Sequence, residues 1–190
     1  MPAKSAKRIP SKAELKVVKA LQEIEASTNN KELKENLKQF RILGAMEAKV
    51  DANKKAIVVV VPLPLAKVCR KIQVALAKEL EKKFANCDVV FVLKRRILPK
   101  SNPHHHVKVN RQRIHTLTAV HEAMIHDIAY PSEVVGERLR VRVGGSKLKI
   151  VLVDAKDKAN VEPRLKSYAA VYKKLTGANA SFEFPVAELE

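Results

Sequence analysis

The stretch Ala-Ile-Val-Val-Val-Val (residues 56–61), followed by Pro-Leu-Pro-Leu (62–65), decides the fold class of this chain. A strand that is apolar at every position is typical of a sheet covered on both faces. The prolines end this strand, and apolar residues then recur at steps of three and four up to Phe84, which predicts a long amphipathic helix. Residues 88–93 are again continuously apolar. We therefore expect a strand–helix–strand crossover with two parallel strands.

Two helices and one strand are predicted before this crossover. Ser11 and Glu14 have the spacing of a capping box, in which each side chain binds the other residue's backbone amide, so a helix should begin there. A second, short helix carries Leu33 and Leu37, and the two form an N-terminal helical pair. Alternating apolar residues from 42 to 50 predict the first arm of a hairpin whose second arm is 56–61.

The C-terminal half continues the mixed pattern. Residues 117–128 predict a helix with Thr116 or Thr118 as its cap, and residues 161–175 predict another that ends at Gly177. Between them, residues 138–143 and 147–153 flank Gly144-Gly145, which predicts a hairpin with a tight primed turn. A short strand is expected over 181–184.

These elements together predict an α/β fold with a mixed, largely antiparallel sheet, packed helices, an N-terminal helical pair and a long basic loop. We expect a basic N-terminal arm over residues 1–10 and a single α/β domain over 11–190, with the basic loop at about 94–115.

Composition favours a nucleic-acid partner. The 190 residues include 37 Lys and Arg against 20 Asp and Glu, a net charge of +17, and such a surface repels itself unless a polyanion neutralises it. The longest apolar run, residues 56–66, is too short for a membrane helix, so no membrane partner is expected. Two widely spaced cysteines, Cys69 and Cys87, indicate a reducing compartment such as the cytosol or nucleus.

The basic loop is the strongest candidate site, because no Asp or Glu occurs from Val89 to His121. The residues expected to bind RNA phosphates there are Lys94, Arg95, Arg96, Lys100, Lys108, Arg111 and Arg113. Alternation along the predicted hairpin places three further arginines on one face, where they widen the same surface: Arg138, Arg140 and Arg142. Aromatic residues are only 4% and Trp is absent, which disfavours base stacking and favours structured RNA recognised by shape.

Sites for catalysis or metal binding are not predicted. His121 and His126 are five residues apart, about 140° around a helix, so they do not form the HExxH pair of metalloproteases. Adventitious metal binding is the best interpretation of the His104–His106 triplet, and a hairpin turn is the best interpretation of Gly144–Lys147, which lacks the spacing of a phosphate loop. We expect no catalytic residue, no cofactor and no metal site.

Several stretches resemble one protein family in order along the chain: residues 71–74 (KIQV), 79–84 (ELEKKF), 95–100 (RRILPK), 116–123 (TLTAVHEA), 130–136 (YPSEVVG), 171–177 (VYKKLTG) and 182–185 (FEFP). This family is the eukaryote-specific ribosomal protein seven of the small subunit. The resemblance implies a structural constituent of the cytosolic small ribosomal subunit that binds and stabilises its rRNA, including expansion-segment RNA, and takes part in assembly. It also implies contacts with neighbouring small-subunit proteins and pre-ribosome assembly factors, and a nucleolar stage.

By the same resemblance, Arg95, Arg96 and Lys100 correspond to rRNA contacts. This chain departs from the family over residues 102–107 (NPHHHV), where a denser run of Lys and Arg is usual. Two other classes stay open from the residues alone. One is an RNA-modifying enzyme or its RNA-targeting subunit, and the other is a scaffold whose basic loop binds an acidic protein.

Overall fold

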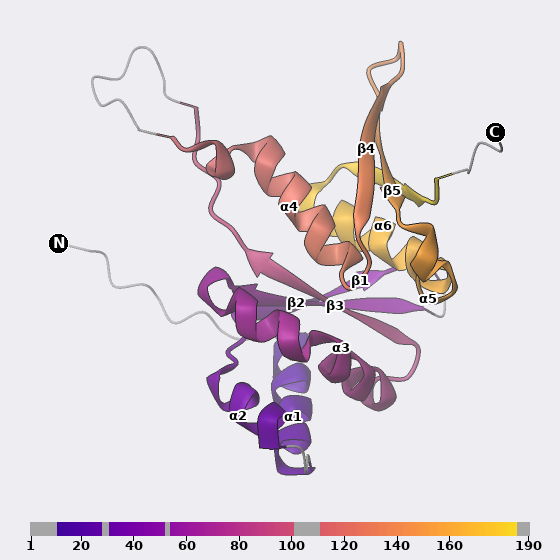
Figure 1. Ribbon diagram of the computed structural model, residues 1–190. Coiled ribbons are helices and arrows are strands. Elements are labelled where there is room, and N and C mark those ends of the chain that lie inside the picture. Colours follow the sequence, from indigo (N-terminus) through magenta and orange to yellow (C-terminus); the bar gives the residue numbers. More distant parts are fainter. Residues whose placement is uncertain (1–10, 28–30, 52–53, 101–110, 186–190) are drawn as a thin grey trace.

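The computed structural model, shown in Figure 1, describes residues 11–27, 31–51, 54–100 and 111–185. The N-terminal arm expected over 1–10 lies outside these ranges. The described strands form two three-stranded sheets where the sequence suggested one, and the mixed α/β class with packed helices is confirmed. Two helices precede the first strand, namely α1 (Lys12–Ser27) and α2 (Lys31–Gln39), so the N-terminal helical pair is confirmed as well.

The first sheet contains the predicted crossover. Its strands lie in the order β1 (Gly44–Lys49), β2 (Lys55–Pro62) and β3 (Cys87–Lys94). Strand β1 is antiparallel to β2, and β2 is parallel to β3. The connection from β2 to β3 runs through a short 3-10 turn and α3 (Ala66–Lys83). The parallel pair and its helix therefore confirm the prediction from residues 56–93.

The second sheet contains β4 (Val134–Val141), β5 (Lys147–Val153) and β6 (Asn179–Glu183) in that order. Strands β4 and β5 form an antiparallel hairpin, and β6 adds in parallel to β5. Helix α4 (Leu117–Ala129) precedes this sheet, and the connection from β5 to β6 contains α5 (Lys158–Val161) and α6 (Leu165–Thr176).

Both faces of the first sheet are covered, as Figure 1 shows. Val59 and Phe91 contribute to an apolar cluster with α1, α2 and α3, whereas Val58 and Val90 contribute to a second cluster with α4, α6 and the second sheet. Successive residues of β2 thus enter opposite cores, because side chains alternate across a strand. This is the physical reason why residues 56–61 are apolar throughout.

Helix starts follow the predicted caps. The Ser11 amide donates to Glu14 Oε2 at 3.0 Å and the Glu14 amide donates to Ser11 Oγ at 3.2 Å, which completes the capping box of α1. Thr116 is the cap of α4, since its Oγ1 accepts from the Ala119 amide at 3.4 Å. No described helix is long and apolar enough to cross a bilayer.

The turn between β4 and β5 differs from the prediction. The Gly145 amide donates to the Arg142 carbonyl at 2.9 Å, and the Arg142 amide donates to the Ser146 carbonyl at 3.0 Å. Gly145 has a φ of 77°, whereas Gly144 does not lie in the left-handed region. The prediction of a two-residue primed turn is therefore wrong, because a primed type I turn needs both glycines at positive φ. The turn is a three-residue loop whose last residue is left-handed.

Candidate nucleic-acid interface

The ends of the basic loop lie side by side where β3 leads out and α4 begins (Figure 1). The Leu98 amide donates to the His115 carbonyl at 3.0 Å, and His115 Nδ1 lies 3.1 Å from the Arg96 carbonyl oxygen. We call residues 95–100 and 111–115 the loop stem. These contacts fix the path of the stem without forming a strand. Residues 101–110, which include Lys108 and His104–His106, lie outside the described part of the chain.

Most predicted phosphate contacts in and beside the stem are exposed cations: Lys94, Arg96, Lys100 and Arg113. None of these four forms an ion pair with a carboxylate of the described residues. Arg111 differs, since it is half-buried and its Nε is buried without a hydrogen-bond partner in the described ranges. The stem therefore presents positive charge that nothing in its described surroundings neutralises.

Arg95 is the exception among the predicted contacts. Its guanidinium binds the carboxylate of Asp127 through both terminal nitrogens, with Nη2 3.1 Å from Oδ1 and Nη1 on Oδ2. The side chains are only 15% and 6% exposed. The structure thus turns Arg95 toward the protein interior, where its charge is compensated, and we leave it out of the exposed cationic set.

Asp127 is the residue that sequence analysis missed. It is itself buried on α4, next to buried Ile128, and its Oδ2 also accepts the Leu93 amide at 3.1 Å, near the end of edge strand β3. One carboxylate therefore fixes both the end of β3 and the first arginine of the stem. The signal was present, because a carboxylate beside Ile128 on the apolar side of a helix needs a cationic or hydrogen-bonding partner.

The hairpin arginines form a second group of exposed cations. Arg138 and Arg140 lie on β4 opposite Ile150 and Leu148, and Arg142 follows the end of that strand. Every residue from 138 to 147 is exposed. In Figure 1 the hairpin end and the loop stem project from the molecule with α4 between them. Two separate cationic projections are thus available to one extended polyanion.

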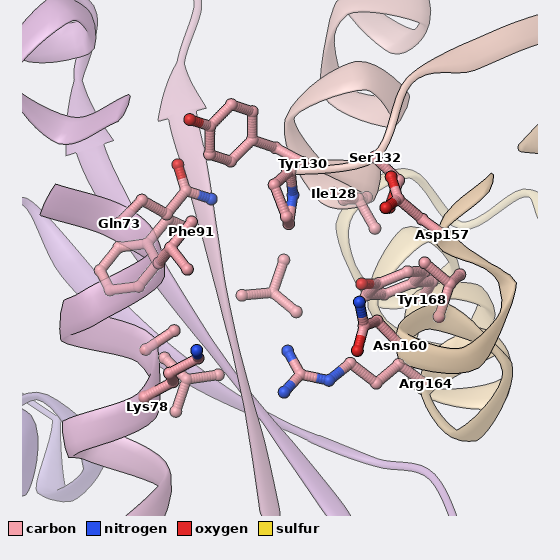
Figure 2. Close-up of a pocket in the computed structure, with 16 residues that line it drawn as sticks. Gln73, Lys78, Phe91, Ile128, Tyr130, Ser132, Asp157, Asn160, Arg164 and Tyr168 are labelled. Atoms are coloured by element: carbon pink, nitrogen blue, oxygen red, sulfur yellow. The ribbon is translucent and has the colours of Figure 1, made fainter. Parts of the chain in front are cut away.

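A cavity of about 210 Å³ lies beside β3, and Figure 2 shows Gln73 and Lys78 on one side of it with Arg164 and Tyr168 on the other. Arg164 Nη2 lies 2.9 Å from Glu81 Oε2, and Glu81 Oε1 accepts the Val89 amide of β3 at 3.4 Å. Such contacts protect the free edge of a sheet from pairing with another chain. Glu81 and Arg164 beside this cavity therefore cover the free edge of β3.

The histidines and cysteines named from the sequence lie apart from one another. His121 packs edge-on against Tyr172, with ring centroids 6.3 Å apart, and His126 is exposed elsewhere on α4. Burial raises the pKa of the Cys69 thiol to about 11, with Asp127 adding to the effect, so this thiol stays protonated. No group of three or more potential ligands for a metal ion occurs in the described ranges.

Comparison with known proteins assigns the family. The model of the family described as "Ribosomal protein S7e" matches residues 2–184. The chain belongs to the ribosomal protein S7e family. Curated relatives match over nearly their whole length. "Small ribosomal subunit protein eS7" of Schizosaccharomyces pombe is 44% identical over 94% of this chain and 90% of its own.

Other S7e relatives give the same result. A protein of the same name from Avicennia marina is 45% identical over 94% of this chain and 92% of its own, and "Small ribosomal subunit protein eS7B" of Saccharomyces cerevisiae is 43% identical over 93% of this chain and 92% of its own. Among solved structures, the "Crystal structure of APE1850" aligns over 91% of this chain and 99% of its own, with a TM-score of 0.43 and 14% identity. That likeness is too low to inform fold or function. The family resemblance noted in the sequence is thus confirmed.

Proposed function

We propose that this S7e protein is a structural constituent of the small ribosomal subunit and binds its rRNA. The observation that carries the proposal is the set of exposed cations in and beside the loop stem, Lys94, Arg96, Lys100 and Arg113, which have no carboxylate partner among the described residues. Phosphate groups of a structured RNA would neutralise them, with release of condensed counterions. The names of the relatives, which are small-subunit proteins, support the same assignment.

The finer parts of the proposal concern partners and place. We propose that the arginine face of the hairpin, formed by Arg138, Arg140 and Arg142, binds a second part of the same RNA, and that expansion-segment RNA belongs to this contact. Lys108 and Arg111 are retained as predicted contacts. Neighbouring ribosomal proteins and pre-ribosome assembly factors are further proposed partners. The protein would act on cytosolic ribosomes after a nucleolar stage of assembly. An RNA-modifying enzyme finds no support in a family of ribosomal proteins.

The salt dependence of RNA binding tests the loop stem. The purified chain should bind small-subunit rRNA with an affinity that falls linearly in a plot of log K against log salt concentration. In the variant Arg96→Gln/Lys100→Gln/Arg113→Gln, the slope should become shallower by about 0.7 to 0.9 for each phosphate that the protein no longer neutralises.

A matched control removes the same charge from another place. Lys12, Lys16 and Lys19 are exposed on α1, and their replacement by Gln should leave the slope nearly unchanged. Equal changes of slope in both variants would mean that RNA responds only to net charge, and the proposed site would be abandoned. Incorporation is measured separately, because a tagged chain should sediment with small subunits in eukaryotic cells depleted of their own S7e protein.

A further inference from the structure

The outer half of the β4–β5 hairpin is a ribbon that the rest of the protein does not support. All ten residues from 138 to 147 are exposed, although β4 and β5 are paired as far as Val141 and Lys147. A two-stranded ribbon alone is marginally stable in water. A partner that covers its faces would stabilise it.

The two faces of this ribbon differ in chemistry. Arg138 and Arg140 lie on one face, whereas Leu139 and Val141 lie on the other because side chains alternate along a strand. Leu139 is 62% exposed and Val141 is 57% exposed. The second face also carries Lys149 opposite Leu139 and Lys147 opposite Val141, so it combines exposed apolar side chains with cations. Phosphates would satisfy the cations of either face but would leave Leu139 and Val141 exposed.

The face that carries Leu139 is turned toward α4 and contributes to one wall of a groove of about 430 Å³. Leu139, Lys147 and Lys149 line it from the hairpin, and Thr118, His121 and Glu122 line it from α4. Leu117 is 52% exposed and lies one helical turn before His121, on the same side of α4. We call this groove the hairpin groove. Leu117 on α4 and Val141 on the ribbon are exposed apolar side chains just outside its lining.

The charges of the hairpin groove indicate its partner. Lys147 is exposed and forms no ion pair with the described carboxylates, whereas Lys149 lies 2.6 Å from Glu137. Glu122 is exposed on the opposite wall, so a carboxylate of a partner is expected beside Lys147 and away from Glu122. Contiguous exposed apolar side chains are typical of surfaces that bind protein. A carboxylate of the partner protein near Lys147 would complement the charge of that side chain and of this strongly basic chain.

We propose that the hairpin groove docks an acidic, amphipathic segment of another protein, whose apolar side chains contact Leu117, Leu139 and Val141 and whose carboxylates reach Lys147. The hairpin then joins two kinds of partner, with protein on its apolar face. This docking does not depend on the RNA contacts of the loop stem.

Site-specific photo-crosslinking in intact cells tests the proposal. A benzophenone amino acid replaces Val141 in one variant and Arg140, on the opposite face, in the matched control. After irradiation, crosslinked peptides and nucleotides are identified by mass spectrometry. Position 141 should yield one protein segment that carries both carboxylate and apolar side chains, whereas position 140 should not yield that segment.

Two further variants connect the crosslink to the groove. For these variants the benzophenone amino acid replaces Thr118, on the opposite wall of the groove. Both Lys147→Glu and Leu139→Ser/Val141→Ser alter exposed residues, so the fold should persist, and each should reduce the crosslink from position 118 about tenfold. RNA at position 141, a basic protein segment, no crosslink, or a crosslink unchanged by both variants would overturn the proposal. Failure to sediment with small subunits would refute the proposed function alone, because the crosslinking is done on whole cells.

Discussion

Replacing Asp127 by Ala should destabilise this protein more than any other single change in the loop region. Asp127 accepts two hydrogen bonds from Arg95 and one from the Leu93 amide, and its side chain is 6% exposed. The substitution would leave a guanidinium that is only 15% exposed without its counter-charge, and a strand amide without its acceptor.

The expected loss in the free energy of unfolding is about 3 to 5 kcal/mol, the usual cost of removing one partner of a buried ion pair. That is a large share of the roughly 5 to 15 kcal/mol typical of a domain. Asp127→Asn should lose less, because its amide oxygen can still accept from Leu93 or Arg95. The apolar pair Arg95→Met/Asp127→Leu should recover part of the loss, since no charge is then left buried without a partner.

Urea denaturation with linear extrapolation measures these differences. Glu122→Ala is the control on the same helix, where the residue is exposed, and should change stability by less than about 0.5 kcal/mol. Hydrogen exchange adds a local measurement, because the Leu93 and Leu98 amides should exchange faster in Asp127→Ala. A loss below about 1 kcal/mol, or exchange at both amides as in the parent chain, would refute the role given to Asp127.

Three other predictions concern titration and backbone conformation. Burial raises the pKa of Cys69 to about 11, so iodoacetamide should modify half-buried Cys87 first and Cys69 only on unfolding, as mass spectrometry can show. Burial, and to a smaller extent Lys149, lowers the pKa of His121 below 6.5, so the unfolded chain binds this proton more readily than the folded one. The free energy of unfolding should therefore fall as the pH drops below about 6.5, and urea midpoints measured against pH should show a shallower fall in His121→Gln. Gly177 ends α6 with a φ of 76°, a conformation that strains any residue with a Cβ atom, so Gly177→Ala should lower the free energy of unfolding by about 1 kcal/mol. Thermal unfolding measures this loss, and an unchanged stability would contradict the prediction.

The sequence predicted the elements well where one periodicity dominated. Residues 56–61 indicated a strand covered on both faces because every position is apolar, and the two clusters around Val58 and Val59 confirm it. It did not predict that the strands divide into two sheets. Hydrophobic patterns report which face of a strand is buried and not which strand lies beside it.

The candidate site was predicted in outline and not in the role of each cation. An acid-free segment identified the loop, but Arg95 and Arg96 are adjacent and carry the same charge, and only the tertiary contact with Asp127 separates them. The sequence distance between Arg95 and Asp127 hides that pairing. In the hairpin, alternation predicted the shared face of the arginines, while the apolar face became informative only when the structure showed Leu139 and Val141 to be exposed.

The central claim is that the exposed cations of the loop stem contact rRNA phosphates, and a cryo-electron microscopy map of small subunits that contain this chain tests it most directly. We predict that terminal nitrogens of Arg96, Lys100 and Arg113 lie within about 3 Å of phosphate oxygens, while Arg95 remains on Asp127. Stem cations that face solvent, or that all pair with carboxylates of neighbouring proteins, would contradict the account.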